Sequence, residues 1–258
     1  IQKTRIDGQL DGFKTNKEFL ELVSQYEKMF FRHLDIPEED KKFFPAQVKG
    51  IQFLYSRQSA LLGDEVGVGK TIQAVVAADI RMRKSGPGCL IITKNAVVPQ
   101  LIVEIQKITG ATNAEISGNW QAPSRWTVLP YQIFEEDAMV AGADGVARPL
   151  REIATETLIN YAKNKKFTVC ILDEVHMVKN GNPEHRNVDG FLKHKSSHRT
   201  FNVQEITKNI PFVWGASATI VANKPRDLLN QLKAINHGLG NMDYSEFKNI
   251  FDSSDDEI

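Results

Sequence analysis

The sequence predicts an α/β fold in which a mostly parallel sheet carries helices on both faces. Two observations lead to this prediction. From Pro45 onward, short apolar runs of strand length alternate with stretches of helical periodicity, as expected of repeated βαβ units. The stretch GDEVGVGKT at 63–71 follows one such run and precedes a helical pattern. A strand, a glycine-rich loop and a helix in that order are typical of phosphate-binding α/β domains.

Each predicted strand is an apolar run bounded by polar or turn-forming residues. The expected strands are residues 59–62, 89–93, 127–129, 168–172 and 212–214. The expected helices are residues 16–32, 45–56, 70–84, 97–108, 150–163, 225–235 and 244–251. The region 135–149, which is rich in Gly, Ala and Asp, is expected to be a surface loop or insertion.

The composition is that of an ordinary globular chain of 258 residues, with 41% apolar and 25% charged side chains. No apolar stretch is long enough to cross a bilayer, so no membrane span is expected. Basic and acidic residues balance at 32 each, so contact with nucleic acid would need a local basic surface. Cys89 and Cys170 lie in apolar runs and are expected to be free thiols.

The glycine-rich stretch has the order of a phosphate-binding loop. Gly67 and Gly69 would let successive backbone amides turn toward an anion at the N-terminus of a helix. Lys70 would reach the β and γ phosphates, and the Thr71 hydroxyl would join a magnesium shell. The strict pattern has glycine where this chain has Asp64. The alternative is a glycine-rich turn with an incidental lysine, which the flanking strand and helix disfavour.

Two carboxylates follow the apolar run 168–172, which places them at the carboxyl edge of the sheet. Asp173 is expected to hold magnesium, and Glu174 to orient and deprotonate the attacking water. A solvated helix cap is the alternative for such a pair. With the phosphate loop upstream, the pair predicts binding and hydrolysis of Mg-ATP. His176 is expected to couple the acids to residues 217–219, and magnesium is the only ion implied.

Six segments, in their order along the chain, resemble those of the first RecA-like lobe of Swi/Snf-family proteins, which are helicase-like motors of superfamily two. They are FPAQVKGIQFL, DEVGVGKT, CLIITKNAVVPQLIVEI, TVLPYQIF, DEVHMVKN and GASATIVAN, and the resemblance extends over residues 44–251. It implies a RecA-like P-loop fold and a DNA-dependent ATPase that translocates on double-stranded DNA. Aspartate is common in this family at the position of Asp64, and Lys179 with Asn180 favours it over RNA helicases.

The resemblance also implies roles, position by position. Gln47 would hydrogen-bond the adenine, with a helix-surface glutamine as the alternative. Contacts to ATP are expected from Asp64, Glu65, Gly67, Val68, Gly69, Lys70, Thr71 and Ile72. The catalytic residues would be Lys70, Asp173 and Glu174, and the metal ligands Thr71 and Asp173. The coupling residues would be His176, Ser217, Ala218 and Thr219. Contacts to the DNA backbone, with little sequence preference, are expected from Thr93, Lys94 and Tyr131.

Several positions depart from the family pattern. Val175 stands where alanine is usual, and Leu101 replaces a common tryptophan. Residues 217–219 read Ser-Ala-Thr in place of the usual Gly-Thr-Pro and are closer to strand-separating helicases. The stretch KHKSSHR at 193–199 is expected to be a solvated loop, with contact to phosphates as the alternative.

Three regions are expected along the chain. Residues 1–42 would form an N-terminal helix and linker, 43–251 the ATP-binding lobe, and 252–258 an acidic tail that leads to a second RecA-like lobe. In this class of motor the second lobe supplies the arginines that stabilise the transition state. The first lobe alone is therefore expected to bind nucleotide weakly and to hydrolyse it slowly or not at all.

The sequence leaves two other functions open. A strand-separating RNA or DNA helicase is favoured by residues 217–219, whereas a nucleotide-gated scaffold without turnover is disfavoured by the presence of Lys70, Asp173 and Glu174. The expected partners are double-stranded DNA, in nucleosomes or another DNA-bound complex, and the second lobe. A nuclear location is expected if the source is eukaryotic, and a cytoplasmic one otherwise.

Overall fold

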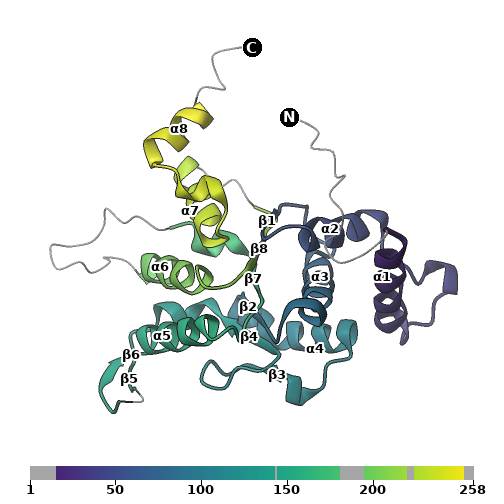
Figure 1. The fold of residues 1–258 in the computed structure, drawn as a ribbon, viewed down its shortest axis with the longest axis horizontal. Coiled ribbons are helices and arrows are strands. Elements are labelled where there is room, and N and C mark those ends of the chain that lie inside the picture. Colours follow the sequence, from purple (N-terminus) through teal and green to yellow (C-terminus); the bar gives the residue numbers. More distant parts are fainter. Residues whose placement is uncertain (1–15, 143, 181–194, 220–223, 253–258) are drawn as a thin grey trace.

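A six-stranded parallel sheet runs through the middle of the described part of the molecule (Figure 1). The computed structural model describes residues 16–142, 144–180, 195–219 and 224–252. The strand order is β1-β8-β7-β2-β4-β3, and every pairing in this sheet is parallel. The strands are β1 (Ser59–Leu62), β2 (Cys89–Thr93), β3 (Ile116–Ser117), β4 (Trp126–Pro130), β7 (Val169–Asp173) and β8 (Phe212–Ala216). Their carboxyl ends therefore meet at one edge.

Helices cover both faces of this sheet, as predicted. One face carries α1 (Asn16–Phe31), α2 (Pro45–Tyr55), α3 (Lys70–Ser85) and α4 (Val98–Thr109). The other carries α5 (Leu150–Lys163), α6 (Lys195–Thr207) and α7 (Pro225–Ala234), and α8 (Tyr244–Asp252) packs on α7. Among these described helices, none is long and apolar enough to span a membrane.

Strand residues alternate between the two cores. On β2, Ile91 packs in the core beneath α1–α4, whereas Leu90 and Ile92 pack in the core beneath α5–α7. On β7, Cys170 and Leu172 likewise join the second core. A strand buried on both faces has no polar positions, which is why these strands appear in the sequence as continuous apolar runs.

All five predicted strands and all seven predicted helices are present, with ends shifted by at most two residues. The short strand β3 was not predicted. The region 135–149, expected to be a surface loop, forms an antiparallel hairpin of β5 (Met139–Ala141) and β6 (Ala147–Pro149). Its residues are largely exposed, so the alternation of buried and exposed side chains that marks a strand is weak there.

The prediction for 193–199 as a solvated loop is wrong from residue 195 onward, because α6 begins there. Residues 193 and 194 lie outside the described part of the chain. The inward face of α6 includes Thr200, Asn202 and Thr207 beside Val203 and Ile206. Three of these five residues are polar, so the sequence does not show the repeat of apolar residues that marks the buried face of a helix.

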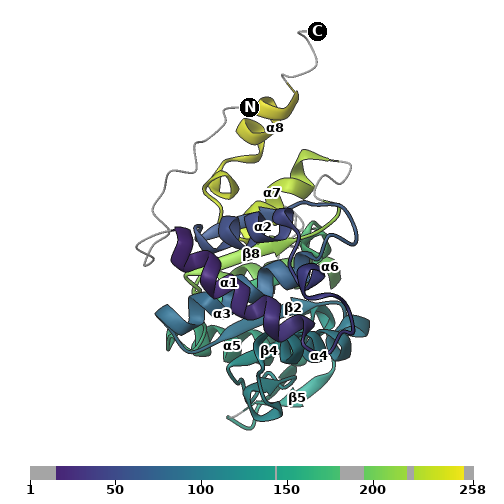
Figure 2. The ribbon, with the colours of Figure 1, turned by 90° about the vertical axis from the view of Figure 1, so that its right-hand side faces the viewer.

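Helix α1 lies outermost on its face of the sheet (Figure 2). A buried carboxylate ties it to α3. Asp79 of α3 is 2% exposed, and its oxygens accept hydrogen bonds from Tyr26 Oη at 2.7 Å, Arg83 Nε at 2.9 Å and Arg125 Nη2 at 3.1 Å. Two arginines offset the cost of burying this charge. Burial, together with the Asp79 charge, raises the pKa of Tyr26. Helix α1 thus packs into the core that includes α2, α3 and α4. The boundary at residue 42 stays a prediction, and residues 253–258 lie outside the described residues.

Replacing Tyr26 with phenylalanine is expected to lower the free energy of unfolding by about 1.5 kcal/mol, because a buried hydrogen bond to a charged group is lost. Urea denaturation measures this. The control is Tyr161→Phe, since the Tyr161 hydroxyl donates at 3.2 Å to the carbonyl of Gln121 at the surface; its effect should stay below about 0.5 kcal/mol. Equal effects of the two changes would contradict the docking of α1 through Asp79.

Candidate functional site

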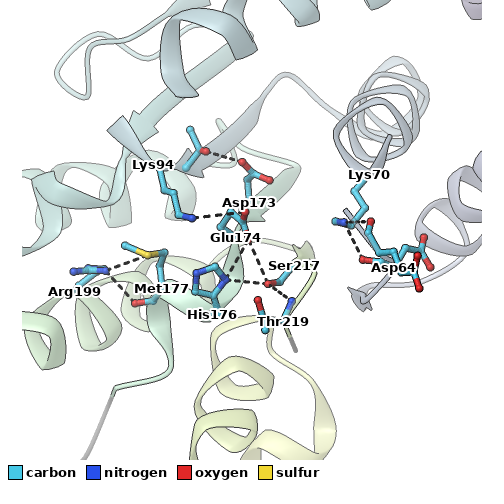
Figure 3. Close-up of polar contacts among 12 residues, drawn as sticks. Asp64, Lys70, Lys94, Asp173, Glu174, His176, Met177, Arg199, Ser217 and Thr219 are labelled. Carbon is cyan, nitrogen blue, oxygen red and sulfur yellow. Dashed lines mark hydrogen bonds and ion pairs between the residues drawn. The ribbon is translucent and has the colours of Figure 1, made fainter. Parts of the chain in front are cut away.

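The loop between β1 and α3 contains two glycines in a left-handed backbone conformation. Gly67 and Gly69 have φ of 86° and 76°, in the left-handed region that favours glycine. Lys70 is the first residue of α3, and its Nζ donates to the carbonyl oxygens of Asp64 at 2.9 Å and Glu65 at 2.7 Å. The lysine therefore closes the loop on itself at the N-terminus of the helix (Figure 3).

Two glutamine side chains hydrogen-bond to the backbone of this loop. Gln47 and Gln73 both donate through Nε2 to the Val68 carbonyl, each at 3.2 Å. The backbone amide of Phe44 donates to Gln47 Oε1 at 2.9 Å, and Gln47 is only 8% exposed. The alternative of a helix-surface glutamine is therefore wrong, and the adenine contact stays a prediction. Gln73 was not predicted; its signal is a polar residue on the buried face of α3, three places after Lys70.

The predicted acids lie where β7 ends. Asp173 is the last residue of that strand, and Thr93, the last residue of neighbouring β2, donates from Oγ1 to Asp173 Oδ2 at 2.6 Å. Burial raises the pKa of the Asp173 carboxyl, although the bond from Thr93 opposes this effect. A half-buried carboxylate of this kind gains from a nearby cation.

Glu174 has φ of 53° and ψ of 51°, a left-handed conformation that is rare for a residue with a side chain. It precedes the 3-10 helix η5 (Val175–Val178), yet its side chain makes no capping hydrogen bond. Its Oε1 instead lies 3.7 Å from Lys94 Nζ, and its Oε2 lies 3.1 Å from His176 Nδ1 and 3.4 Å from Ser217 Oγ (Figure 3). The helix-cap alternative for the acid pair does not describe this geometry.

The predicted coupling residues lie together on the other side of Glu174. His176 Nδ1 is 3.0 Å from Ser217 Oγ, which also accepts the backbone amide of Thr219 at 3.1 Å. A proton on Nδ1 satisfies both Glu174 and Ser217. Burial lowers the pKa of His176, against the opposing charge of Glu174. Ala218 is exposed and faces the cleft described next.

A cleft of about 570 Å³ opens between these elements. The predicted residues that line it are Gly67, Gly69, Lys70, Thr71, Ile72, Asp173, Glu174, Ser217 and Ala218. Its far wall includes Phe30, His33 and Leu34, from the end of α1 and the segment after it. Sequence analysis assigned these three to a helix and linker outside the lobe, and no local pattern marks them as wall residues.

The residues in the cleft fit a magnesium-bound triphosphate. A left-handed glycine loop, a lysine at a helix N-terminus and a threonine hydroxyl meet a carboxylate whose ionised form is disfavoured by burial. Oxygen ligands of this kind suit magnesium, which keeps several waters and the phosphates in its shell. Lys70, Thr71 and Asp173 are the residues that would hold the magnesium ion and the triphosphate.

Of the three residues predicted to contact DNA, two are buried and one is partly exposed. Thr93 and Tyr131 are both 0% exposed, so the expectation that they contact the DNA backbone is corrected. The Tyr131 hydroxyl has no hydrogen-bond partner among the described residues, and burial raises its pKa. Lys94 remains available, with 40% of its side chain exposed. Tyr131 packs in the core beneath α5–α7, and Thr93 donates to Asp173 of the neighbouring strand.

Two departures from the family pattern are accommodated by neighbours. Val175 is fully buried, and a Cβ added at Gly215 of β8 would come within 3.2 Å of Val175 Cβ and 3.0 Å of Leu61 Cδ1. Glycine at 215 thus makes room for valine at 175. Leu101 is 2% exposed and lines a small cavity of about 10 Å³ beside Thr71 and Asp173.

The helices behind the acid pair supply two anchors that sequence analysis missed. Arg199 of α6 donates from Nη1 to the Met177 carbonyl at 3.2 Å. Asn230 of α7 donates from Nδ2 to the Lys179 carbonyl at 2.7 Å. Both hold the backbone that follows Glu174. No short motif marks them, because they approach from separate helices later in the chain.

Residues 46–201 match the family of SNF2-related domains. The chain belongs to this family. It is the N-terminal RecA-like lobe of a Swi/Snf-family helicase-like protein, as the order of motifs predicted.

Relatives of this SNF2-related lobe are identical to it at about a quarter of the aligned positions. A Caenorhabditis elegans homologue of SWI/SNF-related matrix-associated actin-dependent regulator of chromatin subfamily A-like protein 1 is 25% identical over 218 residues, which is 79% of this chain and 25% of that protein. Human TATA-binding protein-associated factor 172 is 26% identical over 181 residues, 64% of this chain and 9% of that protein. The chain thus spans a quarter or less of the length of these relatives.

Two solved structures share the fold. One is the Sulfolobus solfataricus SWI2/SNF2 ATPase core in complex with dsDNA, with a TM-score of 0.55, 18% identity and coverage of 81% of this chain and 38% of that one. The other is the UvsW helicase from bacteriophage T4, with a TM-score of 0.53, 13% identity and coverage of 86% and 65%. At these identities the likeness concerns the RecA-like fold.

The two glycines of the loop between β1 and α3 give a matched pair of tests for this SNF2-related lobe. Gly67→Ala should cost about 1 to 2 kcal/mol of unfolding free energy from its left-handed backbone alone, since a Cβ there meets nothing within 4 Å. Gly69→Ala should cost about 1 kcal/mol more, because its Cβ would lie 2.3 Å from Gln47 Nε2 and displace that amide from Val68. In a Gln47→Ala background the two costs should converge, and a persistent difference would contradict the bracing role of Gln47.

His176 is expected to make stability depend on pH. The pKa of the folded histidine lies below its ordinary value of about 6.5, so the unfolded chain takes up the proton first as pH falls. The contribution of His176 is therefore fully present above about pH 6.5 and is lost below it. The difference in unfolding free energy between wild type and His176→Gln should decrease from pH 7.5 to 5.5. A difference that is flat or rises over this range would show that burial does not control this histidine.

Proposed function

We propose that this SNF2-related lobe binds Mg-ATP and forms half of the catalytic site of a motor driven by double-stranded DNA. The observation that carries the proposal is the convergence of the phosphate loop and the acid pair on one cleft, with Lys70, Thr71, Asp173 and Glu174 all lining it. Lys70 and Thr71 begin α3, which follows β1, and Asp173 and Glu174 lie at the end of β7; β1 and β7 lie on either side of β8. Ligands of open α/β sheets bind at such carboxyl edges.

Each side chain has a distinct task in this proposal. The Lys70 ammonium would exchange its two carbonyl partners for phosphate oxygens, and Thr71 with Asp173 would hold the magnesium ion, which supplies charge neutralisation at the phosphates. Glu174 would orient a water and accept its proton. His176 and Ser217 hold one carboxylate oxygen of Glu174, which limits the rotation of that group.

The proposal for DNA rests on Lys94 and on the family. Lys94 follows β2 and lies within 3.7 Å of Glu174, with both side chains more than a third exposed. A pair this exposed contributes at most about 1 kcal/mol, so a phosphate can compete for the lysine. When a DNA phosphate binds Lys94, the ion pair with Glu174 would be lost, so DNA binding would change the surroundings of the residue that activates water.

Efficient turnover is proposed to need a second RecA-like lobe. Among the described residues, none of the side chains that line the cleft is an arginine, and phosphoryl-transfer enzymes gain several orders of magnitude in rate from one. The described lobe should therefore bind nucleotide and turn over slowly by itself. The family resemblance also underlies two other proposals. Residues 252–258 would form a tail that leads to the second lobe, and the protein would be located in the nucleus of a eukaryote or in the cytoplasm of another organism.

A strand-separating helicase is the second candidate. The observation in its favour is the Ser-Ala-Thr sequence at 217–219, whose serine contacts both Glu174 and His176. A translocase displaces a third strand from a triplex without opening the duplex, whereas a helicase separates the duplex itself. Assays for these two outcomes on a protein with both lobes would distinguish the candidates.

The deciding experiment measures ATP hydrolysis by a protein that continues beyond Ile258 into the second lobe, with and without double-stranded DNA. DNA should stimulate the rate, and Glu174→Gln should lower kcat by about 10²- to 10⁴-fold while nucleotide binding persists, because only proton transfer is removed. The acid-to-amide control is Glu246→Gln, which changes an exposed residue of α8.

Three outcomes would overturn parts of this proposal. Stimulation of ATP hydrolysis by RNA but not by DNA would favour the strand-separating helicase. Unchanged hydrolysis in Glu174→Gln would remove Glu174 from catalysis. Fast, DNA-dependent hydrolysis by the 258-residue chain alone would show that a second lobe is not needed.

A further inference from the structure

Arg199 lies at the junction of three elements just outside the cleft. It belongs to α6, and its Nε and Nη2 donate to Glu135 Oε2 at 3.1 and 2.5 Å. Its Nη1 donates to the Met177 carbonyl at 3.2 Å and lies 3.8 Å from Met177 Sδ. Glu135 ends the 3-10 helix η4 (Tyr131–Glu135), and Met177 lies in η5. In Figure 3, Arg199 points at Met177.

The ion pair is shielded from solvent. The side chains of Arg199 and Glu135 are 12% and 20% exposed, whereas those of the comparable pair Arg148 and Glu156 are 31% and 57% exposed. Solvent screens the second pair much more than the first. The guanidinium of Arg199 is therefore held in one place by both of its partners.

Helix α6 makes a second side-chain contact with η4. Asn202 is 8% exposed and donates from Nδ2 to the Phe134 carbonyl at 2.9 Å. Two side chains one turn apart on α6 thus hold two consecutive residues of η4. The segment after β4 and helix α6 are constrained to move together.

The other end of the junction reaches the acid pair. The Met177 amide donates to the Glu174 carbonyl at 2.8 Å, which closes the turn that begins at Glu174. Arg199 binds the carbonyl of the same Met177. A rigid, planar guanidinium that holds Glu135 and Met177 at once transmits a shift of η4 to η5, and a lysine, with its single ammonium, cannot reproduce this fork.

We propose that Arg199 is a positioning residue that links residues 131–135 to the turn carrying Glu174 and His176, so that the position of residues 131–135 sets the hydrolysis rate. The link itself depends only on the contacts above. Its effect on hydrolysis rests on the proposed function. The two parts therefore need separate measurements.

Hydrogen exchange on the 258-residue chain tests the link. Glu135→Gln and Arg199→Lys both keep the size and packing of the side chain while weakening the fork. Each should raise amide exchange at residues 175–178 by about 3- to 30-fold, although position 135 is forty residues away in sequence. Arg148→Lys, in the exposed pair, should leave these amides unchanged. An increase confined to 131–135, or one equally large at the central strand amides 169–172, would overturn the link.

ATP hydrolysis by the protein with both lobes tests the consequence. Arg199→Lys should lower the DNA-stimulated kcat by about 3- to 30-fold with an unchanged KM for ATP, and the double change with Glu135→Gln should be no worse than either single change. Wild-type kcat in Arg199→Lys, or a parallel loss of ATP binding, would contradict a positioning role. If wild type shows no DNA stimulation, the proposed function fails, while the exchange experiment still decides the link.

Discussion

The parallel register of β7 between β2 and β8 is the constraint on which the site depends. Ile92 pairs with Leu172, and Asp173 pairs with Ala216, so these three strands end within one residue of one another. Thr93, Asp173 and Ser217 therefore arrive at the same edge from distant parts of the chain. Because side chains alternate between faces, a slip of one residue would reverse the direction of Asp173.

The left-handed turn at Glu174 is the second requirement. A residue with a side chain costs about 1 to 2 kcal/mol in this conformation, so the surrounding contacts must hold it. Polar groups hold the carboxylate on the cleft side, and Arg199 and Asn230 hold the following backbone on the helix side. Buried Val175, which packs where Gly215 has no side chain, fixes the turn between them.

Local patterns explain which parts of the fold were predicted. The strands of the sheet, the glycine loop and the position of the acids follow from apolar runs and turn residues a few positions apart. Helix α6 was missed because Thr200, Asn202 and Thr207 interrupt its buried face. The hairpin of β5 and β6 was missed because its residues are mostly exposed and carry no alternating pattern.

The sequence by itself determined the α/β class, the Swi/Snf-type order of motifs and nine of the residues that line the cleft. Only the tertiary structure decided which of these side chains face solvent. It buried Thr93 and Tyr131, left Lys94 accessible, and brought α1 to the cleft and Arg199 to the acid pair. The physical reason is that motif chemistry is local in sequence, whereas burial and hydrogen-bond partners depend on elements that are far apart along the chain.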